Sequence, residues 1–211
     1  MTSVCQQTYR PLELVIVDGG STDRSVELIE NYASQVGDDS FRILLVKEGN
    51  APRGPAYARN LGIRKAQGAS VLLADANVIL EDENIIAALH EALKSSNVAG
   101  FRSKVPIDTW LEFNLMLDVG DPPFHSKGLG CLAFRKNILD EFQFDASLGV
   151  LEDMDLLERI ATAGLLKPTM ISAIGLCHFP HTLVELKAQK KWRGRTILLW
   201  LKKHHFRQNM R

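Results

Sequence analysis

Residues 14–23 read Leu-Val-Ile-Val-Asp-Gly-Gly-Ser-Thr-Asp, an apolar and largely β-branched run that ends in an acid and two glycines. Such a run is typical of a buried strand, and the glycines after it favour a tight turn. Asp18 is therefore expected at the carboxyl end of a strand, which is the edge where open α/β sheets bind ligands. The segment predicts an α/β fold with a binding site at that edge.

Further apolar runs are short, are bounded by turn residues and lack helical spacing, so they predict buried strands. The predicted strands lie at 12–17, 42–46, 70–74, 128–134 and 168–174. Segments with helical spacing alternate with them, at 24–36, 55–67, 82–95, 135–142 and 152–163. This alternation predicts a βαβα arrangement with mainly parallel strands. Residues 103–127 mix prolines and aromatics without a sustained period, which predicts a long functional loop with a short helix.

The 211 residues are enough for one sizeable core and few for two. Three widely spaced cysteines fit neither a disulfide framework nor a Cys-x-x-Cys metal site, so we expect a reducing, cytoplasmic setting. No apolar run reaches the roughly 18 residues that span a bilayer. The first residues also lack the basic and apolar regions of a secretory signal.

The zero formal net charge hides an uneven distribution of charge. Residues 186–211 hold nine basic side chains and no acid, so we divide the chain into a domain of residues 1–185 and a basic helical tail. Such a tail can bind phosphates, an anionic membrane surface or nucleic acid, and a solvated tail on an acidic domain is the alternative. We expect no nucleic-acid partner and a location in the cytoplasm, peripheral on the inner face of a membrane.

Two further acidic segments follow Asp18. Asp75-Ala-Asn77 comes after a predicted strand, and Glu152-Asp153-Met-Asp155 opens an amphipathic stretch. Three spaced acidic segments of this kind indicate a site in which different acids bind ligand, bind metal and act as a base.

The fragments that carry most of the chemistry follow one another over about 150 residues, which is hard to produce by chance. They are Gln7-Thr-Tyr9, Val17-Asp18-Gly-Gly-Ser-Thr-Asp23, Ala58-Arg59-Asn60-Leu-Gly62, Asp75-Ala-Asn77, Phe144-Asp145, Glu152-Asp153-Met-Asp155 and Arg159. With these fragments in this order, the chain resembles the family 2 glycosyltransferases of the GT-A fold. The resemblance implies a Rossmann-like, mainly parallel sheet flanked by helices. It also implies inverting transfer of a sugar from a nucleotide-diphosphate sugar to an acceptor hydroxyl or phosphate, assisted by Mn²⁺ or Mg²⁺.

The resemblance also assigns roles to the donor-binding residues. Asp18 would recognise the nucleotide base, because a carboxylate accepts hydrogen bonds from ring and amino N–H groups; a turn or helix-capping acid is the alternative. Arg59 would face the donor oxygens. Its alternative is a surface ion pair with Asp75 or Asp18.

Asp75 and Asn77 match the family's Asp-x-Asp element, which holds ribose and metal; a strand-end acid with an Asn turn is the alternative. Asn77 departs from that element, since an amide oxygen binds a hard cation without the negative charge of a carboxylate. His178 would be a further metal ligand, and a histidine with a purely structural role is the alternative.

Asp153 would be the catalytic base, and a first-turn acid that complements the helix dipole is the alternative.

The chain begins at Ser3-Val-Cys-Gln-Gln-Thr-Tyr9, where the resembled family completes its first helix after a first strand. A position in the central sheet is therefore expected to be empty, filled by another element or supplied by a partner chain, which would make a homodimer. The missing strand and Asn77 indicate one rival function, a catalytically weak or inactive protein that binds nucleotide sugars. The basic tail indicates another, a module that binds a membrane surface. The acceptor, whether saccharide or lipid-linked, stays open.

Overall fold

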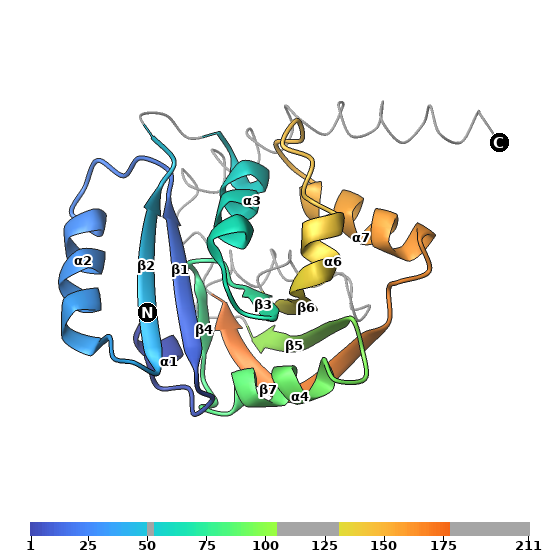
Figure 1. The fold of residues 1–211 in the computed structure, drawn as a ribbon, viewed down its shortest axis with the longest axis horizontal. Coiled ribbons are helices and arrows are strands. Elements are labelled where there is room, and N and C mark those ends of the chain that lie inside the picture. The colour runs from blue at the N-terminus through green and yellow to red at the C-terminus, as the bar shows by residue number, and fades with distance from the viewer. Residues whose placement is uncertain (50–52, 105–130, 178–211) are drawn as a thin grey trace, which may run out of the picture.

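The computed structural model describes residues 1–49, 53–104 and 131–177. Residues 105–127 of the predicted loop, the tail at 186–211 and His178 lie outside these ranges. The described helices and strands form an α/β fold (Figure 1). In the described part of the chain, no helix has both the length and the apolar character needed to cross a bilayer.

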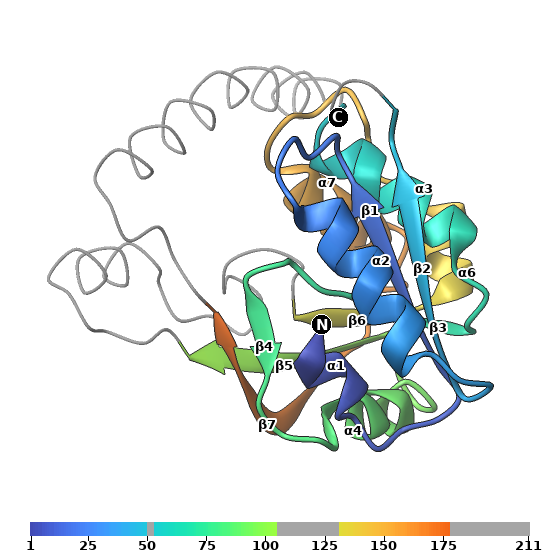
Figure 2. The same cartoon turned by 90° about the vertical axis from the view of Figure 1, so that its left-hand side faces the viewer.

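Strands β1 (Leu12–Asp18) and β2 (Phe41–Lys47) form a parallel pair, in register from Leu12 opposite Phe41 to Asp18 opposite Lys47. Helix α2 (Ser25–Val36) connects them and lies over one face of the pair (Figure 2). The predicted inner face of this helix is partly buried, and its side chains are Val26, Ile29, Tyr32 and Ala33. The βαβ unit predicted around Asp18 is therefore confirmed.

Helix α3 (Pro55–Lys65) packs closely against β1. A Cβ atom added at Gly62 would lie 3.2 Å from Cγ2 of Val17, so a glycine at this place lets the helix backbone approach the strand. This contact fixes the distance between the strand that ends in Asp18 and the helix that carries Arg59.

The remaining described strands form a second sheet, in the order β3-β6-β5-β7-β4. They are β3 (Ser70–Leu73), β4 (Val78–Leu80), β5 (Val98–Lys104), β6 (Leu132–Arg135) and β7 (Pro168–Cys177). The β5–β7 pair is parallel, whereas β3–β6, β5–β6 and β4–β7 are antiparallel. The α/β class is confirmed, but the expectation of a mainly parallel sheet was wrong.

The reason for this error is that helices cover both faces of the five-stranded sheet, as Figure 1 shows. On one face, side chains such as Val98 and Phe134 pack against α3, α6 (Lys136–Glu141) and α7 (Glu152–Thr162). On the other face, Ala99 and Phe101 pack with α4 (Ile85–Ala92). A strand buried on both faces is apolar throughout whichever way its neighbour runs, so the run of apolar residues did not reveal pairing direction.

The first residues are fastened to the loop before α4. After the short helix α1 (Thr2–Cys5), the buried side chain of Gln7 donates to the carbonyl of Asp82 at 2.8 Å and accepts from the backbone N–H of Ile86 at 3.0 Å. Among the described strands, β1 pairs only with β2 and β3 pairs only with β6. The two described sheets therefore share no strand pairing.

Candidate functional site

Asp18 ends β1, and its side chain is held by the turn that follows. The carboxylate accepts hydrogen bonds from the backbone N–H of Gly20 at 3.0 Å and from both the backbone N–H and the hydroxyl of Ser21. Gly20 has φ of 97°, a left-handed conformation that glycine adopts without strain. The hydroxyl of Ser21, ahead of the two backbone donors, holds the pKa of Asp18 below its ordinary value. Asp18 is therefore a turn acid, and its contact with a nucleotide base stays a prediction.

Asp75 and Asn77 lie in the connection between β3 and β4, past the carboxyl end of β3. The carbonyl of Asp75 accepts from the backbone N–H of Val78 at 3.0 Å, which closes the turn. The Asp75 side chain is 39% exposed, and Asn77 is also exposed. Both residues thus lie past the carboxyl end of a strand, where the sequence predicted a ligand site.

Arg59 joins this strand edge to α7. Its guanidinium donates from Nη2 to Oδ1 of Asp75 at 3.1 Å and from Nη1 to Oε1 of Glu152. It also lies over the ring of Phe144, with Cζ 5.6 Å from the ring centroid. The ion pair with Asp75 is the alternative that the sequence left open for Arg59, while direct contact with a donor stays a prediction.

Glu152 has a role that sequence reasoning missed. Its position in the acidic segment that opens the predicted helix did not indicate a buried partner, but the structure buries it against Arg59. Burial raises the pKa of Glu152, and the neighbouring Arg59 opposes that change. For Arg59 itself, burial works against the charged form, but the charges of Asp75 and Glu152 outweigh it and raise the pKa. The sequence shows an arginine in one predicted helix, an acid after a predicted strand and acids at the start of another predicted helix. Nothing in it indicates which of these acids Arg59 contacts.

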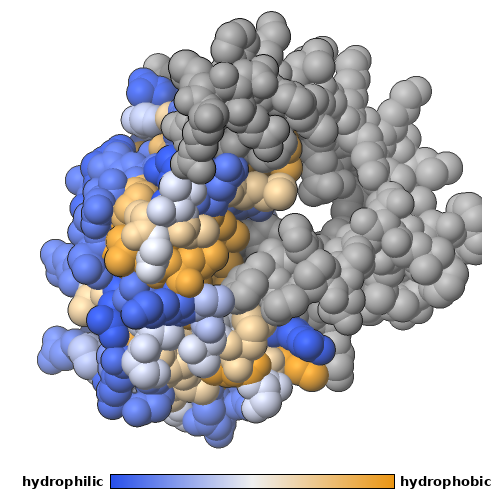
Figure 3. Space-filling model, turned by 90° about the vertical axis from the view of Figure 1, so that its right-hand side faces the viewer, coloured by the Kyte–Doolittle hydropathy of each residue, from blue (hydrophilic) through white to orange (hydrophobic). Residues whose placement is uncertain are grey.

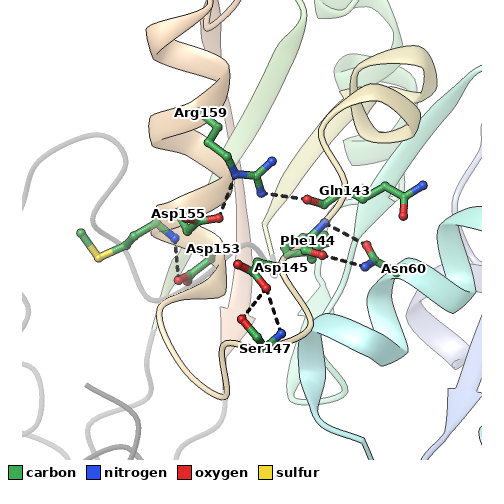
Figure 4. A network of polar contacts seen from close by, with 9 residues as sticks. Asn60, Gln143, Phe144, Asp145, Ser147, Asp153, Asp155 and Arg159 are labelled. Carbon is green, nitrogen blue, oxygen red and sulfur yellow. Dashed lines mark hydrogen bonds and ion pairs between the residues drawn. The ribbon is translucent and has the colours of Figure 1, made fainter. Parts of the chain in front are cut away.

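Asp153, the predicted base, is the second residue of α7 and is partly buried. Its Oδ1 accepts a hydrogen bond from the backbone N–H of Met154 at 2.8 Å (Figure 4). The residue before the helix, Leu151, has φ of 60°, which costs a non-glycine residue about 1 kcal/mol or more. The ion pair of the adjacent Glu152 with Arg59, which also bonds to Asp75, links the start of α7 to the end of β3.

A second set of hydrogen bonds fixes the loop that leads to α7 (Figure 4). The buried amide of Asn60 donates to the carbonyl of Phe144 at 2.8 Å and accepts from its backbone N–H at 2.9 Å. From the other side, Arg159 donates to the carbonyl of Gln143 and to the buried carboxylate of Asp155, each at 2.8 Å. Adjacent residues of α3, Arg59 and Asn60, therefore hold the start of α7 and the loop before it.

The oxygen donors of Asp75 and Asn77 suit a hard cation such as Mg²⁺ or Mn²⁺. In the described residues, no group of three or more His, Cys, Asp or Glu side chains is placed to hold a metal by itself. The donor set nevertheless fits an ion that takes its remaining ligands from water and a diphosphate, as Mg²⁺ commonly does.

A hollow of about 310 Å³ lies elsewhere, at the amino end of β3. Its lining includes Ser70, His90 and Arg135, and none of the described candidate site residues borders it. In the view of Figure 3, apolar side chains gather in a patch bordered by hydrophilic ones. Because none of the described candidate residues lines the hollow, we assign the candidate site to the carboxyl end of β3, where Asp75 lies.

Replacing Asn60 by Ala tests the loop clamp. We expect it to lower the free energy of unfolding by about 2 kcal/mol, because two buried backbone groups of Phe144 lose their partner. Urea unfolding measures the change, and Asn31→Ala, the same substitution at an exposed place on α2, should alter it by about 0.5 kcal/mol or less. Equal effects of the two substitutions would contradict the clamp.

Replacing Ser21 by Ala tests the Asp18 turn. The pKa of Asp18 should rise toward its ordinary value of 3.8. Because the folded-state pKa is the lower one, the hydroxyl stabilises the fold above pH 3.8 and this contribution is lost as the pH falls through the folded-state pKa. A carboxyl NMR titration measures the shift, with Ser34→Ala on α2 as the matched control. An unchanged Asp18 titration in Ser21→Ala would refute this account of the turn.

Comparison with known proteins identifies the family. The chain is 26% identical over 147 residues to an undecaprenyl-phosphate 4-deoxy-4-formamido-L-arabinose transferase of Aeromonas hydrophila, a match that covers 66% of this chain and 44% of that protein. Across four curated relatives, at 26 to 36% identity, the chain spans 24 to 44% of their lengths.

Solved structures agree on the fold. Superposition on S. aureus TarS in complex with UDP-GlcNAc gives a TM-score of 0.66 at 17% identity, covering 86% of this chain and 54% of TarS. The mannosyltransferase PcManGT from Pyrobaculum calidifontis, in complex with GDP-Man and Mn²⁺, gives 0.69 at 21% identity, covering 96% of this chain and 58% of that one. These likenesses confirm the GT-A fold class. A sequence model described as Glycosyl transferase family 2 matches residues 1–141, and the chain therefore belongs to glycosyl transferase family 2.

Proposed function

We propose that the chain catalyses inverting transfer of a sugar from a nucleotide-diphosphate sugar to an acceptor hydroxyl or phosphate. The observation that carries this proposal is the Arg59 bridge, which brings the strand-end acid Asp75 together with the start of α7, where Asp153 lies. This bridge supports the proposal, because it holds the helix that carries the proposed base next to the acid that would bind the cation.

The donor would lie across the carboxyl ends of β1 and β3. Asp18, whose carboxylate is held in place by the turn at Gly20 and Ser21, would accept hydrogen bonds from the base of the nucleotide. Asp75 and Asn77 would hold a divalent cation against the diphosphate, and such a cation, when bound, offsets the charge on the leaving group. His178, which follows β7, is proposed as an additional ligand.

Asp153 would act on the acceptor. As the acceptor oxygen attacks the anomeric carbon, the bond from that carbon to the diphosphate breaks, and the carboxylate of Asp153 takes the proton of the acceptor hydroxyl. Attack opposite the leaving group inverts the configuration of the sugar. Where the acceptor is an ionised phosphate, no proton has to be removed and Asp153 would serve to orient it.

The comparisons support a nucleotide-sugar donor and leave its base open. The names of the structural neighbours contain both UDP-GlcNAc and GDP-Man, while one relative is named for undecaprenyl phosphate. We therefore propose either a saccharide or a lipid-linked acceptor. The basic tail at 186–211 would favour the second by holding the cytoplasmic chain on an anionic membrane surface.

Release of nucleotide diphosphate tests the proposal. Wild-type protein is expected to release UDP from UDP-N-acetylglucosamine or GDP from GDP-mannose when Mn²⁺ is present. Asp153→Asn should slow release by about 10²- to 10⁴-fold, because the base is lost, while calorimetry shows unchanged donor binding. Glu158→Gln, an acid-to-amide change at an exposed place on the same helix, should keep wild-type release.

Two outcomes would contradict the proposal in different ways. Donor binding without release by the wild type would indicate the inactive sugar-nucleotide-binding alternative. Release that survives Asp153→Asn would leave transfer intact and remove Asp153 as the base.

A further inference from the structure

Three charged side chains form a continuous bridge from the surface into the protein. Asp75 is 39% exposed, Arg59 is 18% exposed and Glu152 is 8% exposed at the side chain. Arg59 lies between the two acids and donates to both. The innermost acid, Glu152, has little access to solvent, and it shares the guanidinium of Arg59 with Asp75.

We propose that Glu152 is a positioning residue, which holds the guanidinium of Arg59 between itself and Asp75 and thereby sets how strongly Asp75 binds a divalent cation. The inference rests on the proposed function, because it assigns a cation to Asp75. It gives Glu152 and Arg59 a part in the site that does not require either to touch the donor.

The first support is the cost of burying Glu152. A carboxylate that loses water is retained in a fold when a charged partner compensates for it, and here that partner is Arg59. Removing the charge of Glu152 would leave Arg59 with Asp75 as its remaining partner in the bridge. The guanidinium would then neutralise Asp75 more completely and compete better with a metal ion for the same oxygens.

The second support is that Arg59 has little freedom to move. Its guanidinium lies over the ring of Phe144, and the backbone of Phe144 is held at both its N–H and its carbonyl by Asn60. Arg59 and Asn60 are adjacent on α3, so the helix fixes the guanidinium and the ring beneath it together. A divalent cation bound at Asp75 would therefore lie near the guanidinium of Arg59, whose position is set by the fold.

Opposed substitutions separate this electrostatic role from a merely structural one. Binding of Mn²⁺ alone is measured from the electron paramagnetic resonance signal of the free ion, in the full chain. Glu152→Gln should weaken Mn²⁺ binding about tenfold, because the charge that shares Arg59 is gone. Arg59→Gln should tighten it several-fold, since the competing cation is removed. The double variant should return to at least the wild-type affinity.

A structural role for the bridge predicts a different pattern. Both single variants would then weaken Mn²⁺ binding and the double variant would be no better than Glu152→Gln, which would overturn the inference. Glu158→Gln, the same change at an exposed place on α7, should bind Mn²⁺ as the wild type does.

Asp75→Ala separates failure of the inference from failure of the proposed function. If Asp75→Ala abolishes Mn²⁺ binding and Glu152→Gln leaves it unchanged, the inference is wrong and the proposed cation site stands. If the wild type binds no Mn²⁺, either alone or with UDP or GDP present, the inference and the proposed cation site are both wrong. Opposite effects of Glu152→Gln and Arg59→Gln in a protein that releases no nucleotide diphosphate would support the inference and contradict the transferase activity.

Discussion

The largely buried guanidinium of Arg59 is the interaction on which the candidate site depends. It lies on a helix that packs against β1 through Gly62, and it bonds to an acid beyond β3 and to the first residue of α7. Helix α3, the segment after β3 and the start of α7, which are distant in sequence, therefore meet at the guanidinium of Arg59. Because neither acid is placed there by its own local structure, the geometry of the site follows from where α3 holds Arg59.

This arrangement explains why the loop before α7 is so well fastened. The Asn60 side chain forms hydrogen bonds with both the N–H and the carbonyl of Phe144, and Arg159 donates to the carbonyl of Gln143. A loop without such bonds would let α7 shift, and the bridge to Glu152 would lengthen. Backbone hydrogen bonds thus supply the precision that an ion pair by itself does not, since an ion pair tolerates a range of geometries.

Much of this fold could be predicted from local pattern. The run before Asp18 has the strand and turn residues that the structure uses, and the helical spacing of Val26, Ile29, Tyr32 and Ala33 correctly gave the inner face of α2. The joint order of the short motifs indicated the family, which the match over residues 1–141 confirms. Pairing direction could not be predicted, because strands covered on both faces are apolar in either orientation. The burial of Glu152 and the clamp at Asn60 depend on contacts between residues more than 80 positions apart, which no local period encodes.

The most direct test of the shared guanidinium is a double-mutant cycle in urea unfolding, with Asp75→Asn, Glu152→Gln and the pair. Each single variant leaves Arg59 with one acidic partner in the bridge, whereas the pair leaves it with none. The double variant should therefore lose more free energy of unfolding than the two single variants together, by about 1 kcal/mol. Losses that add to within about 0.3 kcal/mol would show that the two acids do not share Arg59, and would contradict the account.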